Sequence, residues 1–208
     1  MAEVHARLVL ARHGESAINA ANVFTGWTNP PLTAIGRDQA SLIAHRLMDA
    51  KLYPDRIFSS PLDRCNETVA IILSVMGAPD VSATRNLALN ERDYGALTGR
   101  NKDDAAAEYG AEQVRLWRRS YAVAPPQGES LRDTAARVLA YYVRTILPAT
   151  MVGGTSLVVS HGNALRGLVM ALDGMGEAEI EAFDLSTGAT ILYELGPTTG
   201  IVGRSVLA

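Results

Sequence analysis

Short runs of apolar residues alternate along the chain with longer stretches in which apolar residues recur every three or four positions. The short runs are typical of β-strands, and the longer stretches have the periodicity of amphipathic helices. The strand-like runs are residues 8–11, 56–60, 81–89, 155–160 and 189–195, the last of which we expect to be the final strand. This alternation predicts a three-layer α/β/α fold, with a mostly parallel open sheet and helices on both faces.

The helix-like stretches begin at recognisable capping residues. Thr33 has the position of an N-cap before a helix that carries Ile43 and Ala50 on one face. Ser130 and Asp133 have the spacing of a capping box at the start of a long helix. Further helical segments are expected over residues 69–76, 103–119 and 163–172.

The composition is that of an ordinary soluble protein, with 48% hydrophobic and 20% charged residues. A chain of 208 residues without internal repeats, low-complexity segments or a linker suits one compact domain over residues 1–208. Glycine and proline follow the last expected strand, and we expect a flexible C-terminal tail from about residue 196.

Charge and cysteine content narrow the class of protein. The net charge of -3 argues against a general nucleic-acid binder. The single cysteine, Cys65, excludes an internal disulfide framework and fits a reducing compartment. No apolar stretch approaches the roughly 18 residues of a membrane span, and residues 1–9 lack the pattern of a signal peptide. We therefore expect a cytoplasmic protein with no membrane contact.

The first strand-like run stops at a charged turn, in which Arg12, His13 and Gly14 follow the apolar residues directly. Open α/β sheets bind their ligands at the carboxyl ends of the strands, so a ligand crevice is expected at this turn. An arginine guanidinium matches phosphate oxygens with a planar fork of donors, and a histidine can attack phosphorus as a nucleophile. The turn therefore predicts phosphate chemistry.

Other strand-like runs lead into residues of the same kind. Arg64 comes one helical turn after the second run, Glu91 follows the third, and His161 follows the fourth. An ordinary set of surface loops would carry mixed serine, asparagine, aspartate and lysine instead. We therefore interpret these residues, together with Arg12 and His13, as one site at one edge of the sheet.

Phosphoryl transfer assigns a role to each member of this set. A phosphoryl group in transfer carries negative charge on its equatorial oxygens, and the two arginines and His161 can supply donors to it. Nearby positive charge favours the neutral form of His13, which is the form that attacks. Glu91 is the carboxylate placed to protonate the leaving oxygen. The alternative for Glu91 is an ion pair with Arg92 or Arg64.

Other machinery for phosphate or metal chemistry is missing from the sequence. There is no G-x-x-x-x-G-K-[ST] loop, no G-x-G-x-x-G, no H-E-x-x-H and no paired cysteine motif. Cys65 has Ile71 six residues on, where the loop of a thiol phosphatase would have arginine. We therefore expect no metal, and histidine and arginine are expected to perform the chemistry.

At these residues the chain resembles the histidine phosphatase superfamily, through RHGE at residues 12–15 and SHG at residues 160–162. Further motifs are more specific, and together they look like those of the cofactor-dependent phosphoglycerate mutases. They are FTGW at 24–27, LNERDYGAL at 89–97, NK at 101–102 and WRR at 117–119. The resemblance runs from about residue 8 to residue 195, and it implies a phosphoglycerate-mutase-like domain.

The resemblance implies an enzyme that interconverts 3-phosphoglycerate and 2-phosphoglycerate through a phosphohistidine in glycolysis and gluconeogenesis. By the family pattern, His13 is the phosphorylated nucleophile and Glu91 is the proton donor and acceptor. Arg12, Arg64 and His161 would hold the transferring group. The implied cofactor is 2,3-bisphosphoglycerate, which primes His13. The implied substrate-binding residues are Ser16, Asn19, Thr25, Gly26, Arg92, Tyr94, Lys102, Arg118, Arg119, Gly162 and Asn163.

Two departures from the family and two alternative functions remain. Longer family members carry an extra segment before Glu129 and a longer tail over the site, so the sequence leaves open whether a homo-oligomer forms.

The expected partner is a small phosphorylated anion, with no nucleic acid. One alternative is a phosphomonoesterase of the same superfamily, and another is a catalytically silent phosphate-binding module. The intact set of His13, Glu91 and His161 argues against the silent module, because binding alone needs no nucleophile.

Overall fold

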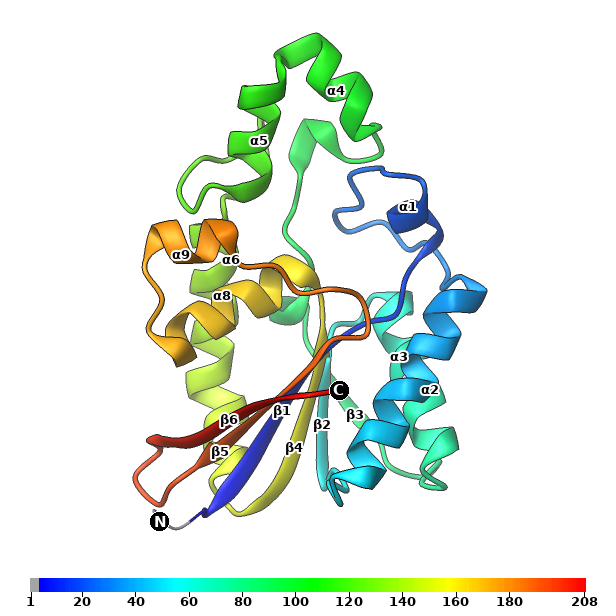
Figure 1. The fold of residues 1–208 in the computed structure, drawn as a ribbon, viewed down its shortest axis with the longest axis vertical. Helices are drawn as coiled ribbons and strands as arrows, with labels where there is room; N and C mark the ends of the chain where they lie inside the picture. Colours follow the sequence, from blue (N-terminus) through cyan, green and yellow to red (C-terminus); the bar gives the residue numbers. More distant parts are fainter. Residues whose placement is uncertain (1–3) are drawn as a thin grey trace.

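The central feature of the computed structural model, which describes residues 4–208, is a single six-stranded sheet (Figure 1). The strands are β1 (Ala6–Arg12), β2 (Arg56–Ser59), β3 (Ala83–Arg85), β4 (Gly154–Ser160), β5 (Thr190–Leu195) and β6 (Ile201–Leu207). Their order is β3-β2-β4-β1-β5-β6, in which the first four are parallel to one another and the last two pair antiparallel. This arrangement confirms the predicted α/β fold with a mostly parallel sheet.

Helices cover both faces of the sheet, because alternate side chains of each central strand point to opposite faces (Figure 1). The covering helices are α2 (Ala34–Asp49) and α3 (Asp63–Val75) on one face, and α6 (Leu131–Tyr141) and α8 (Gly162–Asp173) on the other. In β1, Val9 packs into the core beside Ile43 of α2, whereas Leu10 packs into the core beside Leu165 of α8. The three-layer prediction is confirmed.

A smaller helical region lies beyond the carboxyl ends of the parallel strands (Figure 1). It contains α1 (Ala17–Ala20), α4 (Lys102–Tyr109) and α5 (Ala111–Arg119). A separate apolar cluster that includes Phe24, Leu97 and Trp117 holds this region together. Its position places the side chains of α4 and α5 over the edge of the sheet at which the charged strand ends were predicted to meet.

The remaining regular elements are short. They are 3-10 turns at Leu87–Leu89 and Gly95–Leu97, a π-helical turn at Tyr142–Ile146, α7 (Leu147–Thr150) and α9 (Glu177–Ala182). The predicted caps at Thr33 and Ser130 are confirmed, since the Thr33 side chain accepts from the Gly36 amide and Ser130 forms a capping box with Asp133. No helix within residues 4–208 is long and apolar enough to cross a membrane.

Three expectations about the elements were wrong. The strand expected over 81–89 is confined to β3, because the Asn86 side chain accepts a hydrogen bond from the Ala88 amide and turns the chain. Ala50 is exposed as the C-cap of α2 and does not share the buried face of that helix. The segment expected to be a flexible tail contains β6, which pairs antiparallel with β5 over residues 201–207.

The interpretation of residues 1–9 as lacking a signal peptide rests partly on residues 1–3, which lie outside the described residues.

Candidate active site

The turn that follows β1 packs directly against the start of α2. A Cβ atom on Gly14 would lie 2.0 Å from the carbonyl oxygen of Gly36, and one on Gly36 would lie 2.0 Å from the carbonyl oxygen of Glu15. Two glycines are therefore needed for this close approach of backbones. The approach fixes the path of the chain immediately after His13.

His13 is 2% exposed, and its Nδ1 lies 2.6 Å from the carbonyl oxygen of Gly14. Because a carbonyl only accepts, Nδ1 carries the proton and Nε2 carries the lone pair. Burial, and then the charges of Arg64 and Arg12, hold the pKa of His13 well below its ordinary value. The ring is therefore neutral near pH 7, as a nucleophilic histidine must be.

His161 follows β4 at the N-cap of α8 and is completely buried. Arg64 Nε donates to its Nδ1 across 3.2 Å, so the proton of the neutral ring lies on Nε2. Burial, and then the charge of Arg64, lower the pKa of His161 well below its ordinary value. The centroids of the His13 and His161 rings lie 4.9 Å apart, so the structure brings together the two histidines predicted from separate strand ends.

Arg64 comes from the first turn of α3 and is 1% exposed. Its two terminal nitrogens donate to the carbonyl oxygens of Thr28, at 2.7 Å, and Gly26, at 3.1 Å. Gly26 has a φ of 51°, and a Cβ there would lie 2.8 Å from Thr98 Oγ1. The chain around Gly26 thus orients a buried guanidinium beside His161.

Glu91 lies in the irregular segment after the Leu87–Leu89 turn and not at a strand end as predicted. Its Oε1 accepts from the backbone amides of Arg92, at 2.7 Å, and Asn163, at 3.2 Å. Within residues 4–208 no ion pair joins Glu91 to Arg92 or Arg64, which removes the alternative considered for this residue. The carboxyl is 7% exposed and lines the cavity described next.

A cavity of about 220 Å³ opens at this edge of the sheet. Ten of the residues predicted for the site line it: Arg12, Asn19, Thr25, Glu91, Tyr94, Lys102, Arg118, Arg119, Gly162 and Asn163. His13 and His161 are the chain neighbours of two lining residues, and Arg64 donates to His161. The cavity therefore brings together the end of β1, the first half of α8 and the smaller helical region.

Three other predicted residues have structural contacts and do not line the cavity. Ser16 is buried as the N-cap of α1, where its hydroxyl lies 2.8 Å from Asn19 Oδ1. The carbonyl oxygen of Gly26 accepts a hydrogen bond from Arg64. Arg92 is fully buried and donates to the Tyr94 hydroxyl, at 3.1 Å, and to the carbonyl oxygen of Arg118, at 2.9 Å.

The cations over the cavity come from α4 and α5. Burial, and then the charge of Arg118, lower the pKa of Lys102. Arg119 forms an ion pair with Asp184, with Nη1 and Oδ1 3.3 Å apart. Mutual proximity of positive side chains is unfavourable without an anion between them, so this arrangement favours a strongly anionic ligand.

Unpartnered buried donors support the same kind of ligand. The buried nitrogens without a hydrogen-bond acceptor include Arg12 Nε, both Nε and Nη1 of Arg92, and Arg166 Nε. Most buried polar groups in proteins find partners, so unpaired guanidinium nitrogens around a cavity fit the oxygens of a polyanion. Within residues 4–208, no three His, Cys, Asp or Glu side chains gather as metal ligands would.

Sequence reasoning missed several residues of the site. Arg166 and Asp184 line the cavity, and burial lowers the pKa of Arg166 to about 10. An arginine in the apolar stretch of α8 was a usable signal for Arg166, since an unpaired charge is costly to bury. No comparable signal marked Glu129 and Arg137, which contact the Glu91 segment.

The model of the histidine phosphatase superfamily (branch 1) matches residues 8–204 of this chain. A protein of Xanthobacter autotrophicus named 2,3-bisphosphoglycerate-dependent phosphoglycerate mutase is 52% identical over 197 residues, covering 95% of each chain. One of the same name from Chelativorans sp. is 48% identical over 200 residues, covering 96% of this chain and 97% of the relative. Among solved structures, the alpha-ribazole phosphatase of Shigella flexneri superposes with a TM-score of 0.82 at 27% identity, covering 97% of this chain and 96% of that one.

Proposed function

The chain belongs to the histidine phosphatase superfamily, and from that premise we propose that it is a 2,3-bisphosphoglycerate-dependent phosphoglycerate mutase. It is an isomerase that interconverts 3-phosphoglycerate and 2-phosphoglycerate. The observation that carries the proposal is the surplus of cations around the cavity. One phosphate could be held by Arg12 and Arg64, whereas Lys102, Arg118 and Arg119 add the positive charge that a second phosphate and a carboxylate require.

With His13 already phosphorylated, the first half of each turnover transfers the phosphoryl group from His13 Nε2 to the free hydroxyl of the substrate. The bond from Nε2 to phosphorus breaks, its electron pair returns to Nε2, and Glu91 removes the proton of the accepting hydroxyl. In the second half the lone pair on Nε2 forms a bond to the phosphorus that the substrate carried at the start. The bond from that phosphorus to its oxygen breaks, and the oxygen keeps the electron pair and takes the proton from Glu91.

The surrounding donors stabilise the charge that develops on the phosphoryl oxygens. Arg12 and Arg64 contribute permanent positive charge, and neutral His161 contributes an N–H group. The first backbone amide of α8, at Gly162, adds a donor at a helix N-terminus. Because these groups are fixed by burial before the substrate arrives, little reorganisation accompanies the transfer.

The residues present also fit 2,3-bisphosphoglycerate as the cofactor. Its phosphates and carboxylate would be held by Arg12, Lys102, Arg118 and Arg119, which line the cavity and of which Arg12 has a buried nitrogen without an acceptor. When bound, it supplies the phosphoryl group that primes His13. The other groups that we assign to the transfer are side chains and a backbone amide of this chain, and we expect no metal.

A phosphomonoesterase activity is the second candidate function. It is favoured by the similarity to the alpha-ribazole phosphatase, which extends over nearly the whole chain. The same His13, Arg12 and Arg64 would serve that reaction, with water as the acceptor. The clustered cations of α4 and α5 favour the mutase, because a monoester with one phosphate has no need of them.

The setting of the enzyme is part of the proposal. We infer a single domain over residues 1–208 that acts in the cytoplasm, in glycolysis and gluconeogenesis. Its partner is a small phosphorylated anion rather than nucleic acid, since the net charge is -3 and the positive residues gather at one cavity.

The deciding experiment is turnover of 3-phosphoglycerate by the purified protein, with and without 2,3-bisphosphoglycerate, while 2-phosphoglycerate and free phosphate are followed together. We expect 2-phosphoglycerate to form and its rate to rise steeply with the bisphosphate. Release of free phosphate as the main product, independent of the bisphosphate, would instead make the chain a phosphatase.

A further inference from the structure

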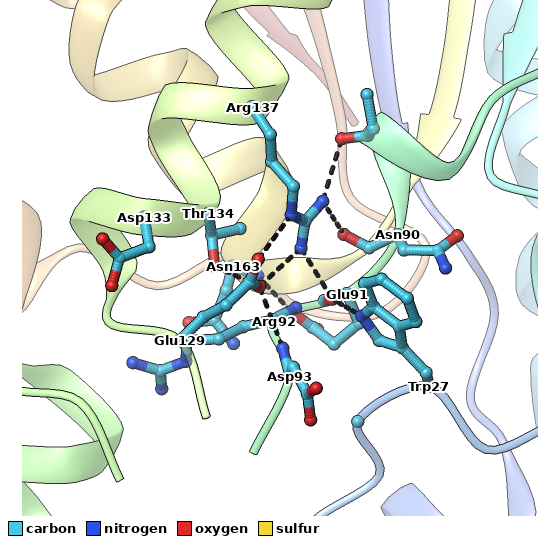
Figure 2. A network of polar contacts seen from close by, with 12 residues as sticks. Trp27, Asn90, Glu91, Arg92, Asp93, Glu129, Asp133, Thr134, Arg137 and Asn163 are labelled. Carbon is cyan, nitrogen blue, oxygen red and sulfur yellow. Dashed lines mark hydrogen bonds and ion pairs between the residues drawn. The ribbon is translucent and has the colours of Figure 1, made fainter. Parts of the chain in front are cut away.

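An ion pair outside the cavity holds the segment that carries Glu91 (Figure 2). Arg137 projects from α6, and Glu129 precedes that helix. Arg137 donates from Nε to Glu129 Oε1 and from Nη2 to Glu129 Oε2, both at 2.8 Å. The two side chains are only 20% and 23% exposed, so the contact is bidentate and largely shielded from water.

The remaining donors of Arg137 all point to backbone carbonyl oxygens. Nη1 donates to Ala88 and Asn90, both at 2.9 Å, and Nη2 donates to Glu91 at 2.8 Å. With the two bonds to Glu129, all five N–H groups of the guanidinium are used. A lysine at this position has three donors and lacks the planar fork, so it cannot make the same set of contacts.

The same segment is held by two further contacts. Trp27 Nε1 donates to the carbonyl oxygen of Glu91 at 2.6 Å, and the Asp93 amide donates to Glu129 Oε2 at 3.0 Å (Figure 2). Glu129 and Arg137 therefore hold the backbone on both sides of Glu91 by hydrogen bonds, at the Asn90 carbonyl oxygen before it and at the Asp93 amide after it. Burial opposes the charge of Glu129, but hydrogen bonds from Arg137 and the Asp93 amide prevail and lower its pKa, so the pair is charged at neutral pH.

Glu91 needs such support because regular structure does not supply it. The residue lies between two short 3-10 turns, Leu87–Leu89 and Gly95–Leu97, and outside the strands of the sheet. A proton donor must stay within hydrogen-bond reach of the leaving oxygen, and a misplacement of about 1 Å can cost about 100-fold in rate.

We propose that Glu129 and Arg137 are positioning residues for proton transfer by Glu91, acting through the backbone of residues 88–93. This inference rests on the proposed role of Glu91 as proton donor. Neither side chain lines the cavity, so the pair acts without touching substrate.

The test is a double-mutant cycle on the full chain, with 3-phosphoglycerate turnover measured in the presence of 2,3-bisphosphoglycerate. Arg137→Met is expected to lower kcat by roughly 10- to 100-fold and to change KM by less than about threefold. The Glu91→Gln, Arg137→Met double variant is expected to be no slower than Glu91→Gln alone, because a proton donor that is absent cannot be misplaced.

The exposed Arg115–Glu112 ion pair on α5 provides a matched control. Arg115→Met removes the same charge from a bidentate pair and should leave kcat unchanged. Thermal unfolding gives the fraction of each variant that is folded at the assay temperature, and kcat is then expressed per folded molecule. A purely structural role for Arg137 would lower Tm and leave kcat per folded molecule at its original value.

Two further variants keep the test decisive if Arg137→Met folds poorly. Glu129→Gln retains the shape of the side chain and removes its charge, and it should lower kcat as Arg137→Met does. Arg137→Ala should recover kcat when guanidinium chloride is added at millimolar concentration, without a matching change in KM, whereas Arg115→Ala should not respond.

The outcomes separate this inference from the proposed function. If Glu91→Gln is slow and the double variant is slower by the full product of the two single effects, the positioning role is overturned and the role of Glu91 stands. If Glu91→Gln retains full kcat, Glu91 is not the proton donor, and the positioning role falls with it.

Discussion

The imidazole rings of His13 and His161 lie edge to face, with centroids 4.9 Å apart and planes inclined at 63°. Their hydrogen bonds require opposite tautomers, so His13 has a lone pair on Nε2 whereas His161 has its proton there. Two buried rings at this distance, with Arg64 close by, disfavour a further positive charge on either ring. Both histidines are therefore kept neutral by the fold itself.

This pair makes the protein sensitive to acid. The pKa of each ring is lowered on folding, so below about pH 6.5 the unfolded chain binds protons that the folded chain does not. Their contribution to stability is complete above about pH 6.5 and is lost as the pH falls. We expect the free energy of unfolding to drop between pH 6.5 and 5.5 by up to about 1.0 kcal/mol for each histidine.

Denaturant unfolding at several pH values measures this slope. His161→Gln removes one of the two groups and should halve the histidine contribution. A slope that is the same in His161→Gln and in the unchanged protein would contradict the neutral state inferred for His161.

Replacement of His13 separates binding from transfer. His13→Ala removes the proposed nucleophile and leaves the cations of the cavity in place. We expect loss of phosphoryl transfer with retention of most of the affinity for 3-phosphoglycerate. Calorimetric titration measures the affinity for 3-phosphoglycerate, and incorporation of labelled phosphate into the protein measures phosphoryl transfer. Any labelled phosphohistidine formed by the variant would refute the assigned role.

The role of Glu91 predicts a dependence on the leaving group. Loss of a general acid typically costs about 100- to 10,000-fold, but only where the leaving oxygen needs a proton. We expect Glu91→Gln to slow transfer from 3-phosphoglycerate by that order, and to slow transfer from p-nitrophenyl phosphate much less. Single-turnover phosphorylation of His13 from each donor gives the comparison. Equal slowing with both donors would show that Glu91 does not act as the acid.

The contact between Gly14 and Gly36 predicts a structural effect on catalysis. A methyl group at Gly36 would meet the carbonyl oxygen of Glu15 at 2.0 Å, and the turn after His13 would have to move. We expect Gly36→Ala to lose about 1–3 kcal/mol of stability and to lower kcat. Gly200→Ala, where a Cβ has no neighbour within 4 Å, is the control and should match the unchanged protein in Tm and kcat.

Asp184 is expected to compete with the substrate for Arg119, with which it forms an ion pair at the cavity. Exposed pairs are worth about 0–1 kcal/mol, so Asp184→Asn should lower KM for 3-phosphoglycerate by up to about fivefold. Steady-state kinetics at low salt measure the effect. Glu112→Gln, which frees an arginine outside the cavity, should not change KM; a KM that rises in Asp184→Asn would show that Asp184 supports the site.

Local signals explain why much of the fold and site could be predicted. The cap at Thr33, the capping box at Ser130 and the turns after β1 and β4 depend on residues close together in sequence. His13 and His161 are adjacent in space because β1 and β4 are parallel neighbours, with Arg12 paired to Ser160. Parallel pairing of the strands was sufficient to bring the two turns together.

Contacts between distant segments explain the parts that could not be predicted. Arg137 meets the Glu91 carbonyl across 46 positions in the sequence, and such a contact has no periodicity or motif. β6 was missed because glycine, proline and threonine around residue 198 are typical of a tail, whereas in the structure they form the turn of a hairpin with β5. The position of Glu91 was also missed, because an asparagine cap ended the expected third strand early.

The burial of Cys65 makes this chain suited to site-specific labelling. The thiol is fully buried, and burial raises its pKa to about 12, so almost none of it is thiolate near neutral pH. Cys65 is also the single cysteine of the sequence. A cysteine introduced at Val206, which is exposed on β6, would then react alone with a maleimide dye, and motion at that edge of the sheet could be followed by fluorescence without first removing a native thiol.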